Sequence, residues 1–276
     1  MKRILSVVIF LFLLININAQ NRIDLFPNDI NIKPFAANTL EPKLGSIFQL
    51  SKNELELNIG NSMDIVRLTN GHGETYSFGA DLFTFTLLRG EQNFHFPVDA
   101  VDYLFGVNFS YRKVVSDYSF GFRGRISHIS AHFVDGHYDG VAQTWRDGLN
   151  PRVYSREFFE LLGFYEFQCL RVYAGGAYLF HVDPATIKKD NFQIGFDYYA
   201  KDLLGDHLTP FIGYDLKLIH LDKYTACNSI SAGIKFGNAD SKGISLLLNY
   251  YSGKSIHGEY FDKNKEYTAL GINLDL

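Results

Sequence analysis

The sequence predicts an all-β protein, an antiparallel transmembrane β-barrel of the bacterial outer-membrane type with about twelve strands and ten as the alternative. Ten or more segments alternate apolar and polar residues over roughly the depth of a bilayer. In the last segment Leu270, Ile272 and Leu274 share one face, whereas Asn273 and Asp275 share the other. Lipid offers no partner for the backbone groups of an open sheet edge, so such strands must close into a barrel.

The first residues predict a secretory signal peptide. Lys2 and Arg3 precede an apolar run that ends at Ile15, and Ala19 is a small residue before a plausible cleavage point. The run is too short for a membrane-spanning helix. Export would carry the protein to the cell outer membrane, and the chain divides into a signal peptide at 1–19, a periplasmic N-terminal segment at 20–43 and the barrel at 44–276.

Period-two alternation predicts twelve strands in chain order. Their expected ranges are 44–50, 54–68, 75–88, 100–113, 116–131, 153–168, 170–181, 191–201, 207–219, 225–237, 243–252 and 266–276. Short connections alternate with long ones, as in bacterial barrels, where periplasmic turns are short and extracellular loops are long. The even count places both ends of the barrel in the periplasm.

The same alternation assigns the two faces of the wall. Phe192, Ile194 and Phe196 are expected to face lipid. The opposite parity carries charges of both signs, among them Asp102, Arg112, Arg123, Arg125, Glu160, Glu166, Arg171, Asp197, Asp215, Lys217 and Lys235. The interior of a small barrel is filled by side chains, so we expect these charges to pair and seal the lumen more than to conduct.

Charge and cysteine content limit the partners. The formal net charge is −4, loss of Lys2 and Arg3 with the leader would make it more negative, and there is no basic run, so no nucleic-acid partner is expected. The expected partners are outer-membrane lipid and, through the C-terminal strand, the barrel-assembly machinery. Cys169 and Cys227 fall at opposite ends of the ~25 Å apolar band, too far apart for a disulfide, so two free thiols are predicted.

One polar cluster, from Ser127 to His137, continues from the fifth strand into a long extracellular loop. His128 and Ser130 have the parity of the lipid face, and their Cβ atoms should lie about 6.5–7 Å apart at a rise of ~3.3 Å per residue. If Arg125 pairs with Glu160 on the sixth strand, His128 lies opposite Glu157. A serine, an imidazole and a carboxylate in this order are the groups that acyl transfer requires.

This outward His-x-Ser, followed by a long loop and Ser-Arg on the next strand, resembles outer-membrane phospholipase A and, with an acidic third member, the lipid A 3-O-deacylases. The resemblance implies Ser130 as nucleophile, His128 as base and Glu157 as the residue that orients the base. The phospholipase pattern has Asn and Gly after the serine and an Asn on the next strand, where this chain has Ala131, His132 and Phe159. The deacylase-like version therefore fits better. No cofactor is expected, unless the activity is phospholipase-like and uses Ca²⁺.

A broader series of motifs is similar to a family of bacterial outer-membrane proteins known as a domain of unknown function. The motifs are His128-x-Ser-Ala-His-Phe-x-Asp135, Tyr154-Ser-Arg-Glu157, Arg171-Val-Tyr-Ala-Gly-Gly-Ala-Tyr-Leu-Phe-His181, Gly213-Tyr-Asp-Leu-Lys217 and Leu248-Asn-Tyr-Tyr-Ser-Gly-Lys254. This resemblance implies the fold and the location, and no activity.

Other readings of the polar cluster remain open. His, Ser and Glu are common at barrel rims because headgroups and water hydrogen-bond there, so the cluster could be a non-catalytic surface. His132, Asp135 and His137 could bind a metal within the loop, although their spacing matches no established signature. At the level of the molecule, a sealed barrel or a narrow transport channel is the alternative to a lipid hydrolase.

Overall fold

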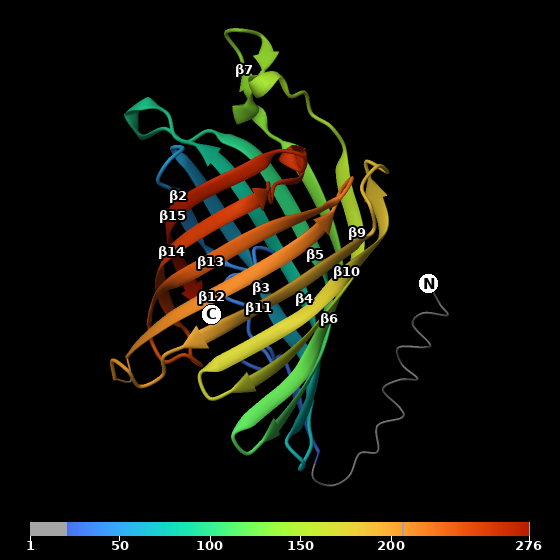
Figure 1. Cartoon of the computed structure of the whole chain (residues 1–276), viewed down its shortest axis with the longest axis vertical. Coiled ribbons are helices and arrows are strands. Elements are labelled where there is room, and N and C mark those ends of the chain that lie inside the picture. The colour runs from blue at the N-terminus through green and yellow to red at the C-terminus, as the bar shows by residue number, and fades with distance from the viewer. Residues whose placement is uncertain (1–20, 206, 276) are drawn as a thin grey trace.

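The computed structural model describes residues 21–205 and 207–275, and it is a closed antiparallel barrel of twelve strands (Figure 1). Strand β15 pairs with β2 from Ala269↔Gln49 to Leu274↔Leu44, and this pairing closes the sheet. The predicted signal peptide and its predicted cleavage point lie outside the described residues. No helix in the described part is long and apolar enough to cross a membrane.

Each predicted strand boundary lies within two residues of the observed one. The wall is formed by β2 (Leu44–Gln49), β3 (Glu54–Thr69), β4 (Glu74–Arg89), β5 (Val98–Val115), β6 (Tyr118–Phe133), β9 (Tyr154–Phe167), β10 (Leu170–Asp183), β11 (Asp190–Tyr199), β12 (Leu208–His220), β13 (Tyr224–Phe236), β14 (Gly243–Lys254) and β15 (Asn264–Asp275). Three short strands were not predicted. They are β1 (Arg22–Leu25), which pairs with the end of β3, and β7 (Tyr138–Asp139) with β8 (Thr144–Trp145), a small hairpin in the long loop.

The observed faces follow the predicted parity. On β11, Phe192 and Ile194 are 52% and 55% exposed, whereas Gln193 between them is 8% exposed. The lumen charges pair as expected: Arg125 Nη2 lies 2.7 Å from Glu160 Oε1, and Arg171 Nη2 lies 2.6 Å from Asp197 Oδ2. The apolar side chains therefore face outward, as in a wall that contacts lipid, and ion pairs join neighbouring strands inside.

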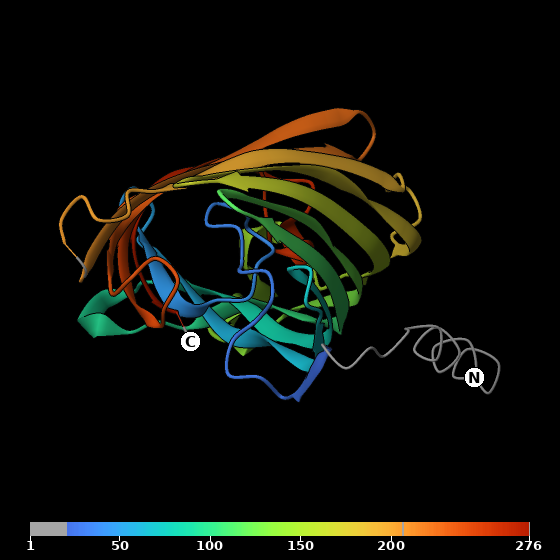
Figure 2. The same ribbon diagram turned by 90° about the horizontal axis from the view of Figure 1, so that it is seen from below.

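The N-terminal segment folds into the periplasmic half of the lumen. After β1 the chain enters the barrel (Figure 2). Phe35 and Glu41 of this segment are fully buried there. The Arg123 guanidinium of β6 donates two hydrogen bonds to Glu41, at 2.8 and 2.5 Å, and Arg125 donates one to the Leu40 carbonyl. These bonds fix the segment to the inner wall.

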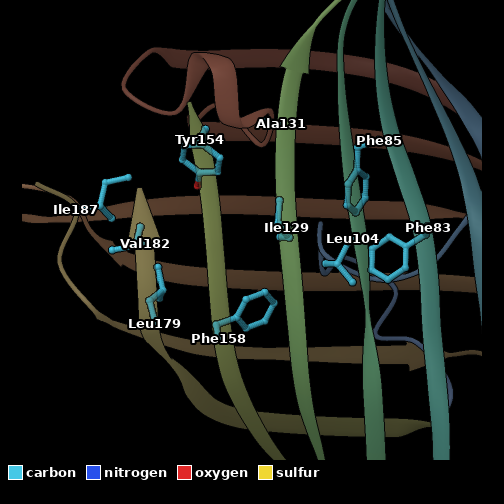
Figure 3. Packing of buried hydrophobic residues seen from close by; sticks show 10 residues of the cluster. All are labelled: Phe83, Phe85, Leu104, Ile129, Ala131, Tyr154, Phe158, Leu179, Val182 and Ile187. Atoms are coloured by element: carbon cyan, nitrogen blue, oxygen red, sulfur yellow. The ribbon is translucent and has the colours of Figure 1, made fainter. Parts of the chain in front are cut away.

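A second seal lies at the extracellular end. The 3₁₀ turn η4 (Gly258–Tyr260), between β14 and β15, folds into the mouth, and its Glu259 and Tyr260 are buried. The Gly258 amide donates to Asp102 on β5 at 2.7 Å. Below the turn lies an apolar cluster that closes the upper lumen (Figure 3), formed by Phe83, Phe85, Leu104, Ile129, Ala131, Tyr154, Phe158, Leu179, Val182 and Ile187.

Both cysteines are free, as predicted. Cys169 lies in the short turn between β9 and β10. Cys227 is buried near the other end of the barrel, close to the start of β13. The predicted alternation of strand directions is confirmed by the antiparallel pairing of all neighbouring strands.

Candidate active site

The predicted register between the two site strands is confirmed. In β6 and β9 Arg125 pairs with Glu160, and His128 therefore lies directly opposite Glu157. The alternation of faces and the match of opposite charges inside the lumen together determine this register, because a slip by one residue would turn the lumen charges of the slipped strand toward lipid.

His128 and Glu157 form the first half of the site. His128 Nδ1 lies 2.6 Å from Glu157 Oε1, and the two side chains are 27% and 30% exposed. The ring nitrogen Nδ1 donates to the carboxylate, and Nε2 has no partner among the described residues. This is the arrangement in which a carboxylate orients a histidine and leaves its second nitrogen free to accept a proton.

Ser130 forms the second half, with a different partner from the one predicted. Its Oγ lies 2.8 Å from Nε2 of His132, not against His128. Both histidines are two residues from Ser130 on the same face, so either is within reach. Because Glu157 holds His128 toward β9, the serine is bonded to His132, which has no carboxylate partner. The hydroxyl thus lies between two imidazoles.

A third histidine joins the site from β10. His181 Nδ1 lies 2.5 Å from Glu157 Oε2, so the carboxylate accepts one bond from each of two histidines on its two neighbouring strands. The register of β10 shifts between Leu179 and His181, which is a β-bulge. Leu179 and Val182 remain buried while His181 is 66% exposed on its side chain, so the extra residue turns His181 to the outer face.

The surroundings of the site are aromatic and open to the bilayer. The ring of Phe105 on β5 lies 4.9 Å from that of His128, and Tyr103 lies 6.0 Å from His132. Phe105 and Tyr103 are 50% and 45% exposed. Ser130 is therefore reached from the lipid side of the wall, not from the lumen.

The loop residues weighed as metal ligands do not come together. His137 is fully buried, stacks on Phe133 at 3.9 Å and is within hydrogen-bond distance of the Leu149 carbonyl. Within the described ranges no group of three or more His, Cys, Asp or Glu residues could hold a metal ion. Calcium takes six to eight oxygen ligands, whereas both oxygens of Glu157 are already bonded to histidines. The donor set around Ser130 does not fit calcium.

Sequence reasoning predicted a site of Ser130, His128 and Glu157, and it did not include His132 and His181, which the structure places in hydrogen-bond contact with Ser130 and Glu157. His132 was visible as a residue of the right parity, two positions after the serine. His181 was not, because strict alternation from Arg171 assigns it to the lumen. Only the β-bulge reverses that assignment, and the amino-acid sequence of the strand contains no distinct signal for a bulge.

Known proteins support the fold and the family. No curated protein matches the chain. Outer membrane phospholipase A from Escherichia coli is similar in structure, with a TM-score of 0.54 and 11% identity over 90% of this chain and 94% of that one. An active-site mutant of the same enzyme gives 0.55 and 12% over the same shares. The calcium-bound dimer of the Salmonella typhi phospholipase gives 0.52 and 12% over 89% and 94%.

At this identity the structural likeness shows an outer-membrane barrel and no activity. The family model described as "Protein of unknown function (DUF1207)" matches residues 98–276. That range includes the site strands β6, β9 and β10 and the motifs from His128 to Lys254, and it leaves the N-terminal segment and the first three wall strands outside. The chain belongs to the DUF1207 family.

Proposed function

We propose that this protein is an outer-membrane lipid acyl hydrolase with Ser130 as its nucleophile. The observation that carries the proposal is the position of the serine, outside the wall and between two imidazoles, one of which is held by a carboxylate. A polar surface without catalysis does not require a histidine with one nitrogen fixed and the other free. A transport channel is less well supported, because the N-terminal segment is bonded inside the periplasmic half of the lumen and η4 inside the extracellular mouth.

His128 is the proposed base. Rotation of the Ser130 side chain about its Cα–Cβ bond moves the hydroxyl from His132 toward the free Nε2 of His128. Ser130 Oγ then attacks the ester carbonyl of a membrane lipid, and its proton passes to Nε2. Glu157 stabilises the resulting imidazolium through Nδ1. The proton leaves with the alcohol, and a water molecule deprotonated by His128 releases the fatty acid from the acyl-enzyme.

The test is fatty-acid release from phospholipid and from lipid A by purified, folded protein. Ser130→Ala and His128→Ala should each reduce the rate by about 10³-fold or more, because they remove the nucleophile and the base. Glu157→Gln keeps a hydrogen-bonding group and should reduce it by a smaller factor. Since the donor set does not fit calcium, chelation should leave the rate unchanged.

Ser127→Ala is the matched control. Ser127 lies on the same strand with its side chain buried on the lumen face, and its hydroxyl has no partner among the described residues. His132→Ala separates the two imidazoles: retained activity supports His128 as base, and a loss equal to that of His128→Ala assigns the base to His132. Folded wild-type protein that releases no fatty acid from either lipid class would refute the proposal.

A further inference from the structure

The periplasmic half of the barrel contains a cavity of about 450 Å³, far from Ser130. It lies between the N-terminal segment and the inner wall, in the region that Figure 2 shows from below. Its lining includes Lys201 and Lys242, in the turns after β11 and β13, and Phe35 in the sealed part of the lumen. The cavity therefore opens toward the periplasm and ends at the layer formed by the N-terminal segment.

The lining is cationic although the protein is acidic. Seven Lys and Arg residues line the cavity against five Asp and Glu residues, whereas the whole chain has a net charge of −4. Two arginines are neutralised by direct ion pairs, Arg112 with Glu166 at 3.0 Å and Arg171 with Asp197 at 2.6 Å. Lys235 is paired with Asp275 at 3.2 Å. The excess charge lies on the other lysines.

Two of those lysines share the carboxylate of Asp240, whose single negative charge cannot neutralise both ammonium groups. Lys33 Nζ lies 3.5 Å from one oxygen of Asp240, and Lys201 Nζ lies 3.1 Å from the other. Burial lowers the pKa of Lys33, and Asp240 offsets only part of that change.

Lys43 and Lys242 are the lining lysines without a carboxylate partner among the described residues, and the less exposed of the two is Lys43. It lines the cavity immediately before β2 and makes no hydrogen bond or ion pair with any described residue. Burial lowers the pKa of its ammonium group and Lys217 lowers it further, whereas the more distant carboxylates of Glu56, Glu41 and Asp215 restore only part of it. A partly buried ammonium without a direct partner is unfavourable, and a bound anion would stabilise it.

The remaining lining is largely apolar. Aromatic and aliphatic side chains face the same space as the lysines, among them Ile32, Phe35, Phe164, Phe211 and Leu247. The volume falls within the roughly 300–1,000 Å³ of ligand pockets, which combine apolar walls with a few polar groups that fix orientation. A small inorganic anion would leave these walls unfilled.

We propose that the cavity binds an amphiphilic anion from the periplasm, with a carboxylate or phosphate head at Lys43 and an apolar tail against Phe35, Phe164 and Phe211. Its ligand class is an acyl or alkyl chain of medium length with a single anionic head. This binding site is independent of the proposed hydrolase, because Ser130 lies outside the wall and the cavity lies inside it.

The experiment is a titration of the folded protein in nanodiscs, with decanoate, decyl phosphate and the neutral decanol as probes that displace a fluorescent fatty acid. Decanoate or decyl phosphate should bind to the wild type at least tenfold more tightly than decanol, since a charged hydrogen bond contributes at this scale. The comparison of the two anions distinguishes a carboxylate from a phosphate head. Inorganic phosphate alone should displace little probe.

Lys43→Gln and Lys43→Met should each weaken binding of the anions about tenfold and leave decanol unaffected. Lys52→Gln, in the exposed turn between β2 and β3, removes the same charge outside the cavity and should change nothing. Equal affinity of wild type and both Lys43 variants would overturn the proposal, as would failure of both anions to bind folded wild-type protein. Neither result bears on fatty-acid release by Ser130.

Discussion

Glu157 is the residue that joins the parts of the site, because each of its two oxygens accepts a hydrogen bond from a histidine on a different neighbouring strand. A carboxylate held on one side only could rotate about its last bond and lose its alignment with His128. His181 removes that freedom. In the proposed mechanism it is a positioning residue, since it touches Glu157 and not the serine.

Substitution of His181 should therefore reduce kcat more than it raises KM. We expect His181→Ala to lower kcat about tenfold, in line with loss of one hydrogen bond to a charged group, and to leave KM nearly unchanged. His181→Gln retains an N–H donor and should recover part of the loss. A purely structural role would show no recovery by Gln, and a role in lipid binding would show a change confined to KM.

The regular strands could be predicted from the sequence, whereas the bulge in β10 and the pairing of β1 could not. Period-two alternation extends over the whole of β11, for example. The sequence alone therefore assigns Phe192 and Ile194 to the outer face and Gln193 to the inner face. The bulge in β10 depends on which residue of β9 each position meets, and β1 pairs with β3 across about forty residues of chain. Such contacts are long-range and leave no local pattern.

The pairing of β6 with β9 was predictable because charge and parity agreed. Arg125 is 1% exposed, and it donates to Glu160 and to the Leu40 carbonyl. Arg125→Ala leaves a buried carboxylate with only Arg123, at 3.6 Å, and should destabilise the barrel by about 3 kcal/mol. Arg125→Met combined with Glu160→Leu should recover part of that loss.

Denaturant unfolding of the folded barrel, followed by heat-modifiable mobility, measures these differences. A coupling energy above about 1 kcal/mol in the double-mutant cycle is the expected result for groups in contact. Additive effects would show that the two side chains do not interact in the folded protein. Ser127→Ala again provides a control on the same strand, because its buried hydroxyl has no partner among the described residues.

At the scale of the whole molecule, the lumen of the barrel is closed at two levels, by the N-terminal segment on the periplasmic side and by η4 on the extracellular side. The N-terminal segment is bonded to β6 through Glu41 and Arg123, and η4 is bonded to β5 through Gly258 and Asp102. Between them lie ion pairs and the apolar cluster of the upper lumen. The proposed chemistry and the proposed binding thereby use separate surfaces, the lipid-facing outer wall for Ser130 and the periplasmic cavity for Lys43.

Two seals in series predict how the protein behaves in a planar bilayer. The wild type should show no single-channel steps. Deletion of residues 21–43 should open the periplasmic half only, and replacement of 256–262 by a short Gly-Ser linker should open the extracellular mouth only, so neither change alone should conduct. The combined variant should conduct once Phe83 and Phe158 of the apolar cluster are also replaced by Ala, because that cluster otherwise still closes the upper lumen. Heat-modifiable mobility verifies that each variant is folded. Steps from the wild type, or from the 21–43 deletion alone, would show that η4 and the cluster beneath it do not close the barrel.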